Sequence, residues 1–96
     1  MSANKLTKQI LQYLNTAGHY AVRINNIPGT KYRKGNVTRG VADIMGCTKG
    51  GKALAVEIKF GKDRQSEFQK EFEEHYKKRG GIYIIAQKIE DVTEVI

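Results

Sequence analysis

Residues 53–60, ALAVEIKF, constrain the fold more than any other stretch of this chain. In a β-strand, successive side chains point to opposite faces of the sheet. One face of this strand would then carry only large apolar side chains: Leu54, Val56, Ile58 and Phe60. The other face would combine two small residues with two opposite charges: Ala53, Ala55, Glu57 and Lys59. The first pattern predicts a core face and the second the floor of a cleft. The alternative is a solvated face with a surface ion pair worth about 0–1 kcal/mol.

A second acid, Asp43, lies among apolar residues in GVADIMG, residues 40–46. Aspartate is disfavoured there both by strand propensity and by burial. If residues 41–47 and 52–60 form a hairpin with a three-residue connection at 49–51, Asp43 lies opposite Glu57, with Cβ atoms about 4.5–5.5 Å apart. A two-residue turn would send Asp43 to the other face.

Two carboxylates at that distance repel each other by about 4 kcal/mol at an effective dielectric constant of 20, and a divalent cation would offset the repulsion. Oxygen ligands favour Mg²⁺ or Mn²⁺, and Mg²⁺ keeps several of its own waters. Asp43, Glu57 and the backbone carbonyl of Ile58 are therefore the predicted metal ligands. With Lys59 beside the ion to orient water or offset developing charge, the expected chemistry is phosphodiester hydrolysis.

Composition sets the broad class of the chain. The 96 residues predict one domain, residues 1–96, and a formal net charge of +7 makes nucleic acid the first partner to consider. The alternative is that the lysines only confer solubility. A single cysteine, Cys47, excludes an internal disulfide, and we expect it to pack in the interior. No apolar run suggests a membrane span or a signal peptide, so we expect a soluble, cytoplasmic protein without membrane contact or organic cofactor.

The expected order of elements is α-β-β-β-α-β-α. Apolar periodicity predicts a helix over 4–17, strands over 20–27, 41–47, 52–60 and 82–87, and a closing helix within 89–96. Residues 25–40 form an irregular basic segment. A further helix starts at Ser66 as N-cap and ends at Gly80. Its apolar stripe, Phe68, Phe72 and Tyr76, predicts core or dimer contacts.

GVADIMG, AVEIKFGKDRQSEFQ and GGIYIIAQ together resemble the PD-(D/E)XK nuclease superfamily, and most closely its stand-alone virus-type replication-repair nuclease (VRR-NUC) domains. The resemblance implies an α/β fold with a mixed sheet flanked by helices. It implies a site formed by Gly40, Asp43, Glu57, Lys59 and Gln69. It further implies a homodimeric, Mg²⁺- or Mn²⁺-dependent endonuclease that cuts branched DNA such as four-way (Holliday) junctions, in a phage or prophage protein acting inside the host cell.

Several assignments stay open at this point. Gln69 could contact a phosphate or the attacking water, or only close a capping box with Ser66, and Gln65 is its substitute. Many relatives carry a glutamate on the first helix, where this chain has no acid, so Asn4 or Gln9 could take part of that role.

Basic and polar residues are candidates for contacting the DNA backbone. For the two residues at the end of the first strand the alternative is an exposed strand face, and for the four in the basic segment it is an unstructured loop. The candidates are Arg23, Asn25, Lys31, Arg33, Lys34, Arg39, Lys62 and Arg64. A non-catalytic nucleic-acid-binding module and a restriction-type duplex endonuclease remain rival functions.

Overall fold

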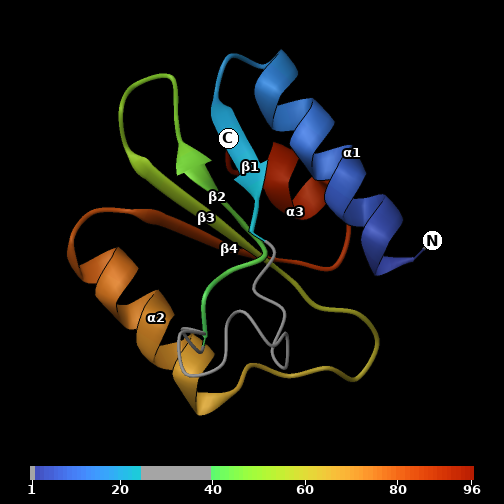
Figure 1. Ribbon diagram of the computed structural model, residues 1–96, viewed down its shortest axis with the longest axis vertical. Helices are drawn as coiled ribbons and strands as arrows, with labels where there is room; N and C mark the ends of the chain where they lie inside the picture. Colours follow the sequence, from blue (N-terminus) through green and yellow to red (C-terminus); the bar gives the residue numbers. More distant parts are fainter. Residues whose placement is uncertain (1, 25–39) are drawn as a thin grey trace, which may run out of the picture.

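The computed structural model describes residues 2–24 and 40–96, and the elements follow the predicted α-β-β-β-α-β-α order. Figure 1 shows a central sheet with helices on both sides. The elements are α1 (Ala3–Thr16), β1 (Tyr20–Arg23), β2 (Ile44–Cys47), β3 (Ala53–Ile58), α2 (Glu67–Lys78), β4 (Ile82–Ala86) and α3 (Glu90–Thr93). The expected mixed sheet flanked by helices is confirmed.

The four strands lie in the order β1-β2-β3-β4. β1, β2 and β3 are antiparallel, whereas β4 runs parallel to β3 and is reached through α2. The hairpin between β2 and β3 has the predicted three-residue connection, because Thr48 N–H donates to the Lys52 carbonyl at 2.8 Å. Gly51 adopts a φ of +91° in this connection, a value that glycine reaches without a Cβ penalty.

One face of the sheet forms the main hydrophobic core. α1 and α3 cover it, as Figure 1 shows on the right of the sheet. Leu54 and Val56 of β3 are fully buried there, as the alternation of residues 53–60 predicted. The helices contribute Leu6, Ile10, Leu14 and Val92 to the same cluster. α1 therefore buries the stripe that its 3.6-residue period defines.

The second face of the sheet differs from the sequence prediction. α2 lies over β3 and β4, and Phe72 and Tyr76 pack with Tyr83 of β4, the Phe72 and Tyr76 rings being 5.0 Å apart between centroids. Ala55 is fully buried beneath them, and Glu57 is only 3% exposed. The predicted open cleft floor is wrong for these two residues, and so is the alternative of a solvated face. Small residues on this face make room for aromatic side chains instead of substrate.

Two further expectations have plain outcomes. Cys47 is exposed, so the prediction that it packs in the interior is wrong. It belongs to the face of β2 that points away from α1, beyond the part covered by α2. Among the described residues, no helix has the length and apolar character needed to span a membrane.

Candidate active site

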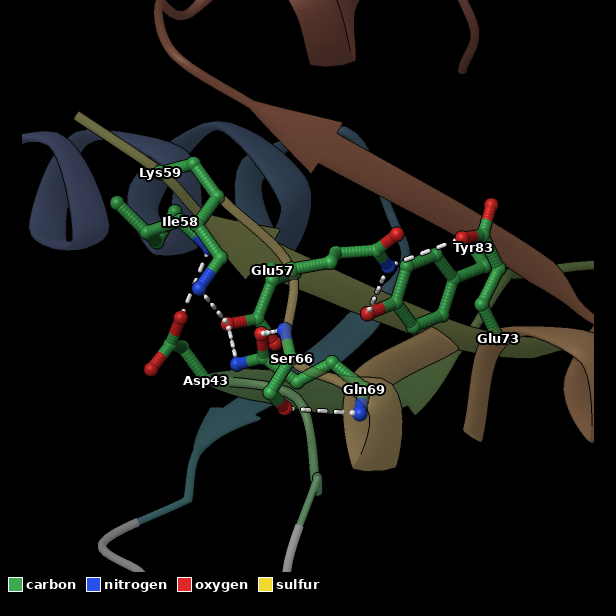
Figure 2. A network of polar contacts seen from close by, with 9 residues as sticks. Asp43, Glu57, Ile58, Lys59, Ser66, Gln69, Glu73 and Tyr83 are labelled. Atoms are coloured by element: carbon green, nitrogen blue, oxygen red, sulfur yellow. Dashed lines mark hydrogen bonds and ion pairs between the residues drawn. The ribbon is translucent and has the colours of Figure 1, made fainter. Parts of the chain in front are cut away.

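The hairpin register brings Asp43 and Glu57 together. Ile44 pairs with Val56, and one further step in the same antiparallel register places Asp43 opposite Glu57. The Asp43 carboxylate is held there because its Oδ2 accepts a hydrogen bond of 2.8 Å from the backbone N–H of Ile58. Its own carbonyl accepts from Ile24 N–H at 2.8 Å, which ties this residue to the end of β1. Figure 2 shows Asp43 and Glu57 turned toward one another beside Lys59.

The Glu57 carboxylate has two different oxygens. Oε2 accepts a hydrogen bond of 2.7 Å from Gln69 Nε2 and lies 3.6 Å from Lys59 Nζ. Oε1 is buried and has no hydrogen-bond partner among the described residues. A buried charged oxygen without a partner costs free energy, so this atom is a site where a ligand would be stabilised.

Burial and charge both alter the ionisation of Glu57. Its pKa rises from 4.5 to about 7, first because burial disfavours the charged form and second because the Asp43 carboxylate is close. The ammonium group of Lys59 opposes this rise but does not cancel it. Near neutral pH, both the protonated and the ionised form of Glu57 are therefore populated, and such shifted pKa values are common at catalytic sites.

Gln69 closes the capping box, which is one of the two roles that the sequence left open, and it also contacts Glu57. Its Oε1 accepts from Ser66 N–H at 2.9 Å, and its backbone N–H donates to Ser66 Oγ at 3.1 Å, which completes the capping box of α2. Its Nε2 donates to Glu57. The capping box fixes the orientation of the Gln69 side-chain amide. Its oxygen accepts from Ser66 N–H, so only its nitrogen can donate to the Glu57 carboxylate.

Gly40 explains how the Asp43 segment reaches the start of α2. It has a φ of +83°, and a Cβ at this position would overlap the carbonyl of Phe68 and lie 2.9 Å from the backbone nitrogen of Gln69. Only glycine allows this close approach of two backbones. The contact sets the first turn of α2, and with it Gln69, beside the segment that carries Asp43.

The donor set fits a hard divalent cation. Among the described residues, no three His, Cys, Asp or Glu side chains are grouped so that they could hold a metal by themselves. Mg²⁺ is commonly held by one or two carboxylates, with waters and substrate phosphates completing its shell. Ile58 directs its N–H to Asp43, and the carbonyl of a strand residue lies on the same side as its N–H, so this carbonyl also faces Asp43. Asp43, Glu57 and Ile58 therefore suit Mg²⁺ or Mn²⁺.

The other predicted residues are placed less closely. Arg23 lies on the face of the sheet that α1 covers and donates to Asn4 Oδ1 at 2.6 Å, so it is on the opposite face from Asp43 and Glu57. Gln9 lies near Ile89, away from the carboxylates. Lys62 and Arg64 are exposed in the connection between β3 and α2. The candidates outside the described residues are Asn25, Lys31, Arg33, Lys34 and Arg39.

Gln65, the substitute for Gln69, points elsewhere. Its Nε2 donates to Glu73 Oε1 at 2.9 Å and lies 3.4 Å from the Tyr83 hydroxyl, which Figure 2 shows on the far side of Glu57 from Asp43. Burial raises the pKa of Tyr83 to about 12, so the hydroxyl stays protonated at neutral pH. Gln65 anchors the β3–α2 connection to α2 and β4 instead of contacting the two acids.

Sequence reasoning missed the residues of β4 that lie beside Lys59. Glu57 pairs with Ile85 in the parallel register, and Gln87 follows directly after the strand. A parallel pairing across a helical connection leaves no signal in local periodicity, so only the assembled sheet reveals it.

The fold is a small α/β domain with a four-stranded mixed sheet flanked by helices. A solved structure described as "VRR_NUC domain protein" superposes on this chain with a TM-score of 0.70 and 19% sequence identity, covering 99% of this chain and 84% of the other. This similarity confirms the fold expected from the sequence. No protein-family model and no curated protein sequence matches the chain.

Proposed function

We propose that the protein is a Mg²⁺- or Mn²⁺-dependent DNA endonuclease that hydrolyses phosphodiester bonds in branched DNA such as four-way junctions. One observation carries the proposal: Asp43 and Glu57, far apart in the sequence, converge with Lys59 through the hairpin register and the Ile58–Asp43 hydrogen bond. The similarity of the fold to a protein described as a VRR_NUC domain supports it.

Each residue has a distinct part in the proposed chemistry. A divalent cation held by Asp43, Glu57 and the Ile58 carbonyl would supply Lewis-acid polarisation of the phosphate and lower the pKa of water. Gln69 engages Glu57 Oε2, which leaves Oε1 for the cation. Lys59 offsets negative charge that develops on the phosphate in the transition state, an effect strengthened because its side chain is only 14% exposed.

The choice of DNA as substrate rests on charge and on the resemblance. A formal net charge of +7 favours a polyanion. The resemblance adds branched DNA, a homodimer, and action in the cytoplasm of a phage host cell. A two-fold dimer suits two symmetric cuts across a junction.

The test is cleavage of a labelled four-way junction and of a matched linear duplex, each with Mg²⁺, Mn²⁺ or EDTA. We expect junction cleavage that needs the metal and disappears in Asp43→Asn and Lys59→Met. Lys78→Met, on the exposed end of α2, is the matched control and should cut normally. Cleavage in EDTA, or by pure Asp43→Asn protein, contradicts the proposal. Cutting of linear duplex at a fixed sequence would instead identify a restriction-type enzyme.

A second function, a nucleic-acid-binding module without catalysis, is favoured by the composition of α1. This helix contains no acid, and Asn4 Oδ1 is engaged by Arg23. Such a module would bind the junction in a salt-dependent way, would not cut it with any metal, and would lose little affinity in Lys59→Met. The same cleavage and binding measurements separate the two functions.

A further inference from the structure

A basic depression lies directly beside Lys59, on the β4 side of the site. It has a volume of about 330 Å³, and its lining includes Lys59, Arg64, Lys70, Ile85 and Gln87 together with Asp63. We call it the β4 basin. Lys59 belongs both to the proposed active site and to this basin, so the two are continuous.

The parallel register of β3 and β4 builds the basin floor. Ile85 pairs with Glu57, so the two side chains lie next to each other on the face that α2 partly covers. Ile58 pairs with Ala86, and the next step brings Gln87 beside Lys59. The floor thus runs from Lys59, directly after β3, to Ile85 of β4 and Gln87, directly after β4.

The walls of the basin are cationic. Among the lining residues, the three cations Lys59, Arg64 and Lys70 outnumber the one acid, Asp63, and Lys59 is also paired with Glu57 behind the lining. Lys70 is 59% exposed and lies 3.6 Å from the freely exposed Glu67, so its ammonium group can leave this partner at little cost. A second depression that includes Lys62 continues past Asp63 and Arg64. Along this path cationic side chains outnumber the acidic one, Asp63, so the path favours an anionic chain.

Ile85 adds an apolar contact to the floor. Its side chain is 40% exposed although it lies in the sheet, because β4 is an edge strand and α2 does not reach this end of it. A floor that is apolar at its centre and cationic at its rim matches a sugar–phosphate backbone, in which apolar sugar faces alternate with phosphates.

We propose that the β4 basin binds the sugar–phosphate backbone of the DNA strand on one side of the scissile bond, with Lys70, Arg64 and Gln87 contacting its phosphates and Ile85 its sugars. This inference rests on the proposed function for the nature of the substrate. It assigns one direction in which the strand leaves the active site, across the end of β4.

The test measures binding without cleavage. Affinity for a fluorescent four-way junction is determined by anisotropy in EDTA over a range of salt concentrations, for Arg64→Gln, Lys70→Gln and the double variant. We expect a threefold to tenfold loss per substitution, and a salt slope lower by about 1 for each cation removed. Lys78→Gln, eight residues further along α2 and hence about 12 Å away along the helix axis, is the control for charge alone.

Ile85→Glu tests the floor, since it replaces the apolar contact with a negative charge that would repel the strand. Val95→Glu makes the same change at a site that is 57% exposed on another surface. Losses at Arg64, Lys70 and Ile85 that exceed those of the two controls support the basin. Losses equal to the controls overturn it, even if the wild-type protein cuts junctions. Binding losses confined to the basin, without cleavage under any metal, uphold the basin and reject the endonuclease.

Discussion

The side-chain amide of Gln69 links the N-terminus of α2 to Glu57, accepting a hydrogen bond from Ser66 N–H at 2.9 Å and donating one to Glu57 Oε2 at 2.7 Å. The position of the buried carboxylate is thereby coupled to the cap of a helix. Ser66→Ala removes one half of the cap and keeps the contact to Glu57, whereas Gln69→Ala removes the other half of the cap together with that contact.

Ser66→Ala should lower the free energy of unfolding by about 1 kcal/mol, because it removes one half of the capping box. It leaves Gln69 Nε2 in place, so cleavage well below the melting temperature should change little. Gln69→Ala removes the contact to Glu57 and should slow cleavage by about 10–100-fold, as loss of a residue that orients a metal ligand does. Urea unfolding and junction cleavage check both. Equal loss of cleavage in the two variants contradicts this division of roles.

Glu57 should make the metal-free protein less stable as pH rises from 4.5 to about 7. The folded state raises the pKa of Glu57 to about 7, so within this window the folded chain keeps a proton that the unfolded chain releases. Protonation then favours the folded state, and its contribution is lost as pH rises through the folded pKa. The whole contribution is on the order of 3 kcal/mol.

The measurement is urea unfolding in EDTA at several pH values, with Glu57→Gln as the control that keeps the shape but cannot ionise. The difference between wild type and Glu57→Gln should change across the window in the predicted direction. Parallel stability curves would show that Glu57 has an ordinary pKa in the folded protein.

Mn²⁺ binding should weaken below about pH 7. The cation and the proton compete for Glu57, so affinity should fall by up to about tenfold for each pH unit below its pKa. Calorimetric titration between pH 5.5 and 8.5 measures this slope and the protons released. Asp43→Asn should bind Mn²⁺ far more weakly at every pH, because one of the two carboxylate ligands is gone. A constant affinity across the range would place the ion elsewhere.

Gly40→Ala should destabilise the protein by several times more than Gly80→Ala. Both glycines have nearly the same φ, +83° and +82°. A Cβ at Gly40 overlaps the Phe68 carbonyl, whereas one at Gly80 meets nothing within 4 Å. The conformational penalty alone is about 1–2 kcal/mol and applies to both variants. The steric overlap affects only Gly40→Ala. The difference in melting temperature between Gly40→Ala and Gly80→Ala therefore measures its cost.

Much of the fold was predictable because its signals are local. The Ser66–Gln69 pair marked the start of α2, and Gly50 and Gly51 marked a tight hairpin connection, but only the structure decided for the three-residue form that places Asp43 opposite Glu57. Each depends on residues within a few positions of one another, where periodicity, caps and turn chemistry act.

What sequence reasoning missed depends on contacts between distant segments. The burial of Ala55 and Glu57 follows from how α2 packs Phe72 and Tyr76 onto the sheet. The neighbours of Lys59 on β4 follow from a parallel pairing across α2. Neither contact affects the local sequence pattern. The face of β3 that carries Ala55 and Glu57 is therefore covered by α2, and the exposed surface lies beside the end of β4.

The hydrogen bond between Gln69 and Glu57 spans 12 residues of sequence, and Asp43 lies earlier still, on the other arm of the hairpin. A chain emerging from the ribosome therefore holds both acids before the helix that orders one of them exists. The two carboxylates and the amide that orders one of them therefore come together only once α2 has packed against the sheet.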